Sequence, residues 1–362
     1  MIPPNLYELV TFVPNKTEPI HNWFYYKEGY ARELVLWLVK DYNLEGPIFD
    51  PFGGVGTTLL AAKEIGLESI GTDVSPLTVL ASRAKTRNYD IDLLKKALDE
   101  FALLKPQMVG KFPNKKIREL FRAENLDDIY FYFQEIKKIS DERTQDLFLL
   151  ALVDTTGRVA NVMKTGGSLR KIKKRFMSVK KLFLGKIKKM IIDLERTHYA
   201  GPEPLIVQED ARLYCPEPNS VGAIITSPPY LNKIEYTSVY KMELGLFFEE
   251  QETRLRAYVS DAPNVEPRDG LPSIAVAYFD DMKKVMLNMF TALKPKGKAF
   301  IIVAGGCLPD RVIESDDILI KDAKEIGFEL VEKIVARKIS CMSFRTQRIG
   351  SVNESIIVLE KP

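Results

Sequence analysis

The chain has 362 residues, of which 46% are hydrophobic and 28% charged, and its net charge is +3. This composition excludes a wholly disordered, collagen-like or coiled-coil chain, and the length predicts two domains or one core with a large insertion. No run of eighteen apolar residues occurs, and the N-terminus lacks a charged stretch followed by an apolar one. We therefore expect no membrane span and no secretory signal, and a cytoplasmic protein. Three scattered cysteines and two distant histidines predict neither a disulfide framework nor a metal site.

The first ninety residues alternate between helix and strand. A helix is predicted over 33–42, and a short apolar strand then ends at Asp50. The glycine-rich run 51–58 follows and opens another helix. A second strand, 68–72, is followed by another acid, Asp73, and by a helix. This strand, loop, helix, strand, acid, helix order predicts the opening of a parallel, doubly wound α/β sheet.

The alternation stops near residue 90. Four stretches with helical spacing fill 90–203, the last of them running from Ser168 to Arg196. We interpret this segment as a helical insertion for substrate recognition. It would divide the core into an N-terminal part, 1–89, that binds the cofactor and a C-terminal part, 204–362, that carries the catalytic loop.

The positive charge is concentrated inside this insertion. Lys164 to Arg196 contains twelve Lys and Arg against two acids, a net charge of +10, so the rest of the chain is −7. Such a block favours a polyanionic partner, although a solvated helix face is the alternative. The abundance of Lys, Glu and Ile with little Gln also favours a thermophilic source. The candidate substrate-binding residues in the block are Arg170, Lys171, Lys174 and Arg175.

Strands resume after residue 203. One over 204–208 ends at Glu209 and Asp210, and a bare apolar strand over 221–226 runs into Ser-Pro-Pro-Tyr. A helix over 278–293 and a strand over 299–304 follow. The last two strands, 329–339 and 354–360, are predicted to form an antiparallel pair around a basic loop.

The glycine-rich loop indicates a bound nucleotide-like ligand, and three candidates compete. ATP would require a lysine that the run 56–58 lacks, and a dinucleotide would require glycine where Leu59 stands. The third is S-adenosylmethionine, whose cationic end, ribose and adenine could be bound by acids at three strand ends. Those acids are Asp50, Asp73 and Asp210, unless they merely cap helices.

The run Thr226 to Tyr230 predicts chemistry on an amino group. Its two prolines end the strand and carry no N–H donor, so free carbonyls are available as acceptors. The Ser227 hydroxyl and the Pro228 carbonyl could hold both hydrogens of a planar exocyclic amino group and stabilise its developing positive charge. Pro229 stiffens the loop, and Tyr230 offers a face on which a base can stack.

Asp50 to Thr58 (DPFGGVGTT) together with Thr226 to Tyr230 (TSPPY) resembles the paired signatures of amino-methyltransferases, which methylate exocyclic nitrogens of nucleic-acid bases. Within that family Ser-Pro-Pro-Tyr is typical of N4-cytosine enzymes, and Asp or Asn in first place is typical of N6-adenine enzymes. The segment 21–30 resembles the N-terminal motif that packs over the methionine end of the cofactor. The resemblance implies a Rossmann-like, seven-stranded, mostly parallel sheet, with S-adenosylhomocysteine as product. It also implies catalysis at Ser227, Pro228, Pro229 and Tyr230, and cofactor contacts at Tyr25, Tyr26, Asp50, Phe52, Gly54, Gly56, Thr57, Thr58, Asp73, Val74, Asp210 and Ala211.

Three functions remain open for such a chain. The layout resembles archaeal small-subunit ribosomal RNA N4-cytidine methyltransferases, which favours structured RNA or the small ribosomal subunit as partner. The second is a DNA N4-cytosine methyltransferase, solitary or paired with a restriction enzyme. The third is a nucleic-acid-binding protein without catalysis. Further candidate substrate contacts are Tyr236, which could wall the base pocket, and Arg345 and Arg348, in the basic loop between the last two strands.

Overall fold

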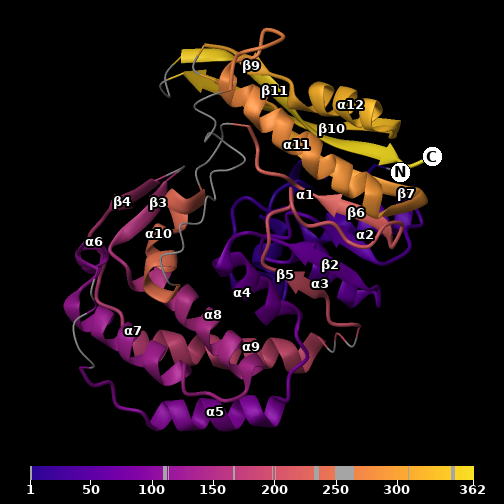
Figure 1. Ribbon diagram of the computed structural model, residues 1–362. Helices are drawn as coiled ribbons and strands as arrows, with labels where there is room; N and C mark the ends of the chain where they lie inside the picture. Colours follow the sequence, from indigo (N-terminus) through magenta and orange to yellow (C-terminus); the bar gives the residue numbers. More distant parts are fainter. Residues whose placement is uncertain are drawn as a thin grey trace.

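A computed structural model describes most of the chain (Figure 1). The described residues are 2–108, 112, 114–165, 168–197, 199, 201–231, 236–248, 265–308, 310–343 and 347–362. No helix among them is long and apolar enough to cross a membrane.

The core is a seven-stranded sheet in the order β10-β11-β7-β6-β1-β2-β5. The five strands from β7 to β5 pair in parallel, and β11 pairs antiparallel with both β7 and β10. This confirms the predicted α/β fold and its terminal antiparallel pair. The strands are β1 (Ile48–Asp50), β2 (Ser69–Thr72), β5 (Leu205–Val207), β6 (Val221–Thr226), β7 (Leu293–Ala304), β10 (Glu329–Ser343) and β11 (Gln347–Glu360).

Both faces of this sheet are buried. Successive side chains of a strand point to opposite faces, so neighbouring apolar residues of one strand pack on different sides of the sheet. On one face Ile48 and Phe300 pack against helices α2 and α3. On the other, Phe49 and Ile301 pack against α11 and α12. The helices around the core are α1 (Leu6–Leu9), α2 (Arg32–Asp41), α3 (Thr57–Glu64), α4 (Pro76–Thr86), α11 (Ser273–Ala292) and α12 (Ser315–Ile326).

The described residues between 91 and 197 form a largely helical body beside the sheet (Figure 1). Its apolar core is continuous with α4 and with the N-terminal segment, and it includes residues of α10, which follows the predicted catalytic loop in the chain. The indole N–H of Trp23 donates to the buried Asp193 carboxylate at 2.9 Å, which ties the N-terminal segment to α9. The helices are α5 (Ile91–Leu103), α6 (Lys115–Arg118), α7 (Ala123–Ile136), α8 (Glu142–Val159), α9 (Val179–Thr197) and α10 (Tyr236–Phe247).

Two features differ from the sequence-based expectation. The basic block is not one helix, because β3 (Val162–Thr165) and β4 (Ser168–Lys171) pair as an antiparallel hairpin and the helix begins only at Val179. In addition, Cys307 and Cys341 form a disulfide between β8 (Gly306–Cys307) and β10; β8 also pairs with β9 (Val312–Ile313). The 34-residue separation of these cysteines offers no local pattern from which to predict the bond.

Candidate active site

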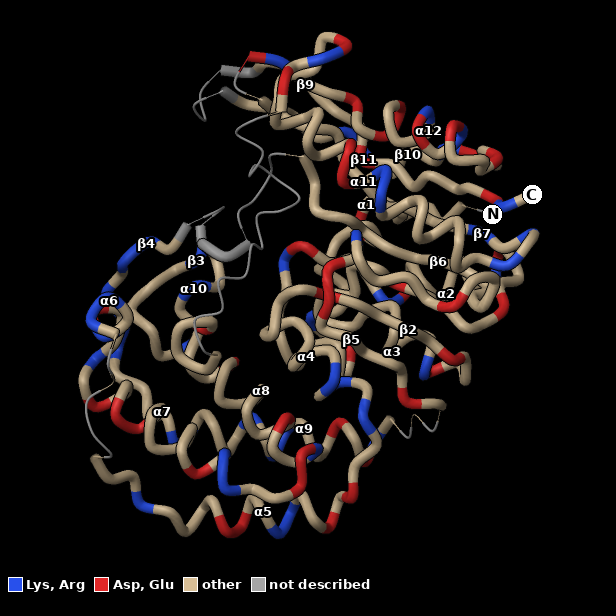
Figure 2. The backbone as a smooth tube through the Cα atoms, in the orientation of Figure 1, with Lys and Arg blue, Asp and Glu red and all other residues tan. Residues whose placement is uncertain are grey.

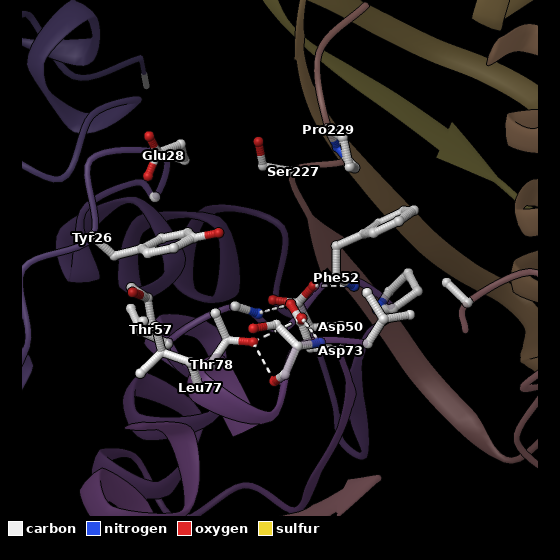
Figure 3. A pocket seen from close by; sticks show the side chains of 18 of the residues that line it. Tyr26, Glu28, Asp50, Phe52, Thr57, Asp73, Leu77, Thr78, Ser227 and Pro229 are labelled. Atoms are coloured by element: carbon white, nitrogen blue, oxygen red, sulfur yellow. Dashed lines mark hydrogen bonds between the residues drawn. The ribbon is translucent and has the colours of Figure 1, made fainter. Parts of the chain in front are cut away.

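A pocket that opens to solvent lies at the carboxyl ends of β1, β2 and β6. In a doubly wound sheet this edge, where the strand order reverses, is the expected ligand site. Tyr26 and Glu28 form one side, Ser227, Pro229 and Phe52 lie opposite, and Asp50 and Asp73 lie at the base (Figure 3). The lining also includes Gly29, Tyr30, Pro51, Gly53, Gly54, Val55, Thr57, Val74, Ser75, Leu77, Thr78, Glu209, Ala211, Tyr240 and Leu244.

The two glycines predicted to bind the cofactor have different surroundings. Both have positive φ angles, +49° at Gly54 and +79° at Gly56, which side chains disfavour. A Cβ at Gly54 would face the Tyr26 ring at 3.7 Å, inside the pocket. A Cβ at Gly56 would lie 2.5 Å from the Ser82 hydroxyl, so this glycine allows the loop to pack against α4.

Asp50 is a buried junction between the two signature loops. Its carboxylate accepts hydrogen bonds from the hydroxyls of Thr226 and Thr58 at 2.7 Å each, of Tyr30 at 3.1 Å, and from the Phe52 N–H at 3.1 Å. Tyr30 and Thr58 also hydrogen-bond each other. Burial raises the pKa of Asp50 to about 6, against the lowering effect of these donors. A direct cofactor contact was expected here, but much of the carboxylate's bonding capacity is taken up by the protein.

Asp73 positions the glycine loop from the end of β2. One carboxylate oxygen accepts the Gly54 N–H at 3.0 Å, and the other accepts the Ser75 N–H at 2.9 Å and the Thr78 hydroxyl at 2.7 Å. Burial raises the pKa of Asp73 above its ordinary value. Asp73 and its neighbour Val74, both predicted cofactor contacts, line the pocket.

Asp210, which follows β5 and was predicted to contact the cofactor, is not among the residues that line the pocket. The Asp210 carboxylate is held by the Arg212 guanidinium, with bonds of 2.6 to 3.1 Å, and Arg212 also donates to Asp281 on α11 at 2.8 Å. The pocket is lined instead by the adjacent Glu209 and Ala211. Sequence reasoning missed Glu209, and two consecutive acids give no indication of which one faces the pocket.

The run after β6 is fixed at both ends. Thr226 is bonded to Asp50, and the Tyr230 hydroxyl donates to Glu354 of β11 at 2.8 Å. Glu354 in turn accepts from Arg337 of β10. Between these anchors, Ser227 and Pro229 line the pocket.

The side of the pocket nearest the helical body is aromatic. Tyr26 stacks on Tyr240 of α10, with ring centres 5.4 Å apart, whereas Tyr25 is 47% exposed and packs edge-on against Phe12. The Lys164 ammonium of β3 lies 3.9 Å from the Tyr240 ring centre and forms a 2.7 Å ion pair with the buried Glu243. A strand of the basic hairpin therefore supports the pocket wall.

The predicted basic contacts separate into two groups. Arg170, Lys171 and Arg175 are exposed, but the Lys174 ammonium donates to backbone carbonyls of Gly157 and Arg158 at 3.3 and 3.1 Å. Basic residues of α6 lie near β4 and extend the positive surface (Figure 2); these are Lys115, Lys116 and Arg118. Arg345 lies outside the described residues, and the side chains of Tyr236 and Arg348 are likewise not described.

Comparison with known proteins gave relatives over nearly the whole chain, although no protein-family model matches it. The type II methyltransferase M.BsoBI of Geobacillus stearothermophilus is 25% identical, over 98% of this chain and 88% of the relative. The type II methyltransferase M.AvaI of a Nostoc species is 23% identical, over 91% and 83%. Among solved structures, a putative DNA modification methylase from Thermus thermophilus is 18% identical over 42% of this chain and 52% of that one, with a TM-score of 0.26.

The raised pKa of Asp50 predicts a pH dependence of stability. Because the folded state binds this proton more tightly than the unfolded state, the contribution is fully present below the unfolded pKa of about 3.9 and is lost as the pH rises through about 6. From about pH 7.5 to about pH 5, the free energy of unfolding of the wild type relative to Asp50→Asn should rise by about 1 kcal/mol. Urea denaturation at both pH values measures this. Asp99→Asn, at an exposed site, is the control. If the free energies of unfolding of the wild type and Asp50→Asn differ by the same amount at both pH values, the pKa of Asp50 is not raised.

Proposed function

We propose that this protein is an S-adenosylmethionine-dependent methyltransferase that methylates the exocyclic N4 amino group of cytosine in DNA. The observation that carries the proposal is the position of Ser227, which faces the pocket built by the glycine-rich loop (Figure 3). An acceptor for an amino group, the Ser227 hydroxyl, thus shares one pocket with a loop suited to the cofactor. A nucleic-acid-binding protein without catalysis would have no need of that arrangement.

The residues present fit S-adenosylmethionine. Gly53 and Gly54 leave an open cradle beside Tyr26, which a side chain at Gly54 would fill. Asp73 and Glu209 line the same pocket and provide carboxylate acceptors for ribose hydroxyls and for the adenine amino group. Tyr26 and Phe52 flank the remaining space toward Ser227, where the methionine end would lie.

The chemistry required of the chain is mainly orientation. The cofactor supplies an electrophilic methyl group on a sulfonium sulfur, which keeps the electron pair of the broken bond and leaves as S-adenosylhomocysteine. The Ser227 hydroxyl and the Pro228 carbonyl accept the two amino hydrogens of the base, so that the nitrogen lone pair points into the pocket. These fixed dipoles stabilise the positive charge that develops on nitrogen, and a proton then leaves to solvent.

DNA is favoured over the ribosomal RNA suggested by the helical insertion. The relatives described above are named type II methyltransferases, the class paired with restriction enzymes, and their similarity extends through the insertion. A target cytosine in a duplex must leave the base stack to reach Ser227. The exposed basic residues of β4 and α6 supply phosphate contacts for the surrounding duplex. Ser227, where Asp or Asn would be typical of adenine enzymes, supports cytosine.

Separate variants should divide catalysis from cofactor binding. Ser227→Ala removes an acceptor for the base, so methyl transfer from labelled cofactor to duplex DNA should fall by about 100-fold or more while cofactor affinity stays nearly unchanged. Asp73→Ala should instead weaken cofactor affinity, because it removes the ribose acceptor and releases the Gly54 N–H. Calorimetric titration with S-adenosylhomocysteine gives the affinities. Equal loss of affinity in Ser227→Ala would contradict its role, and unchanged affinity in Asp73→Ala would remove Asp73 from the cofactor site.

The basic surface should contribute to the salt dependence of DNA binding. Each phosphate contact adds about 0.9 to the slope of log affinity against log salt concentration. Replacing four exposed residues, Arg170, Lys171, Lys173 and Arg175, with Gln should therefore reduce the slope by up to about 3.6. Lys321→Gln with Lys324→Gln, exposed on α12, is the control, and fluorescence anisotropy with a labelled duplex measures binding. An unchanged slope would mean that the block is a solvated face.

A further inference from the structure

Glu28 is an acidic residue of the pocket that the proposed chemistry does not yet use. It lies in the N-terminal segment and lines the pocket beside Tyr26, across from Ser227 (Figure 3). Its side chain is partly buried, and burial raises its pKa more than nearby cations lower it. The carboxyl group therefore retains a proton to a higher pH than an exposed glutamate would.

The position of Glu28 is fixed by its contacts. The Tyr240 hydroxyl donates to Glu28 Oε2 at 3.2 Å. Tyr240 is itself held between the stacked ring of Tyr26 and the Lys164 ammonium, and Lys164 is anchored by Glu243. A carboxyl group has a second oxygen, Oε1, that can carry the proton and donate it. We call these five residues the Glu28 wall.

The Watson–Crick edge of cytosine needs both hydrogen-bond acceptors and a hydrogen-bond donor from the protein. Its N4 amino group donates two hydrogen bonds, and the adjacent ring nitrogen N3 only accepts. Ser227 and Pro228 supply acceptors for the amino group, so a matched pocket needs a donor for N3. An acceptor that loses its water on binding and is left unpaired would weaken the complex. Ionised carboxylates cannot donate, whereas a protonated carboxyl can.

We propose that the Glu28 wall is the subsite for the Watson–Crick edge of the target cytosine, and that the Glu28 carboxyl donates a hydrogen bond to N3. This inference rests on the proposed function and adds to it the residue that reads the base. The titratable and charged groups around Glu28 are Lys27, Tyr25, Tyr240 and Lys164. The ammonium groups of Lys27 and Lys164 favour the ionised form of Glu28. The carboxyl loses its proton, and with it the hydrogen-bond donor, as the pH rises through the raised pKa of Glu28.

The test compares glutamate with its amide across pH. Once wild-type protein has located a methylated duplex site, kcat/KM is measured on that duplex from about pH 4, just below the ordinary glutamate pKa of about 4.3, to about pH 9. The wild-type value should fall as the pH rises through the pKa of Glu28, whereas Glu28→Gln should lack this fall, because an amide donates at every pH. Glu100→Gln, on an exposed face of α5, should keep the wild-type profile. The same fall in Glu28→Gln would overturn the inference.

A second comparison changes the base instead of the protein. In 3-deazacytosine, N3 is replaced by C–H, so the acceptor is absent. Wild-type protein should lose about tenfold or more in kcat/KM on a duplex carrying this base, and Glu28→Leu should lose a similar factor on cytosine but little more on the analogue. If the losses in kcat/KM from Glu28→Leu and from 3-deazacytosine multiply when the two are combined, they are independent and the proposed contact is wrong. The contact would also be wrong if Glu28→Leu lost S-adenosylhomocysteine affinity by the same factor as kcat/KM. Absence of cytosine methylation by the wild type would overturn the proposed function and this inference with it.

Discussion

The arrangement of the site depends on the buried carboxylate of Asp50. Four protein donors, from the N-terminal segment, the glycine-rich loop, α3 and the end of β6, converge on this one group. A carboxylate that is buried without such donors destabilises the fold. The need to keep all four hydrogen bonds to Asp50 therefore fixes the four segments relative to one another. Because Thr226 immediately precedes Ser227, the interaction that fixes the glycine-rich loop also fixes the loop that would hold the base. In the proposed function, the relative position of cofactor and amino group would therefore be set by the interior of the sheet rather than by a mobile surface contact.

The N-terminal segment connects this junction to the helical body. Tyr30 bonds to Asp50, Tyr26 stacks on Tyr240, and Trp23 bonds to Asp193. The apolar core of the body includes residues of this segment and of α4, so the body has no separate core of its own. Lys164 extends the connection to the basic hairpin through its contact with Tyr240. In the proposed function, phosphates are held by the hairpin and α6 while the base is held by a wall that the same hairpin supports.

Much of the sheet and both signature loops could be predicted from the sequence. The strands are short apolar runs that end in an acid or in Pro-Pro, and such a pattern can be recognised from neighbouring residues alone. What each side chain faces could not. Glu209 and Asp210 are adjacent acids just after β5, but Glu209 lines the pocket whereas the Asp210 carboxylate is held by Arg212, a contact that the sequence does not reveal. Gly56 matches the glycine motif, but its close approach to Ser82 depends on the packing of α4. The lysine-rich run 164–175 has strong charge and little apolar periodicity, so its hairpin and the inward turn of Lys174 depend on contacts with α10 and α8.

The most direct test of the account is the identity of the methylated nucleoside. Purified protein is incubated with isotope-labelled S-adenosylmethionine and, in parallel, with duplex DNA, total RNA and intact small ribosomal subunits. Each sample is then digested to nucleosides and analysed by mass spectrometry. We expect labelled N4-methyldeoxycytidine from duplex DNA and no labelled nucleoside from the two RNA samples. Labelled N4-methylcytidine from RNA with unlabelled DNA, or labelled N6-methyldeoxyadenosine, would contradict it.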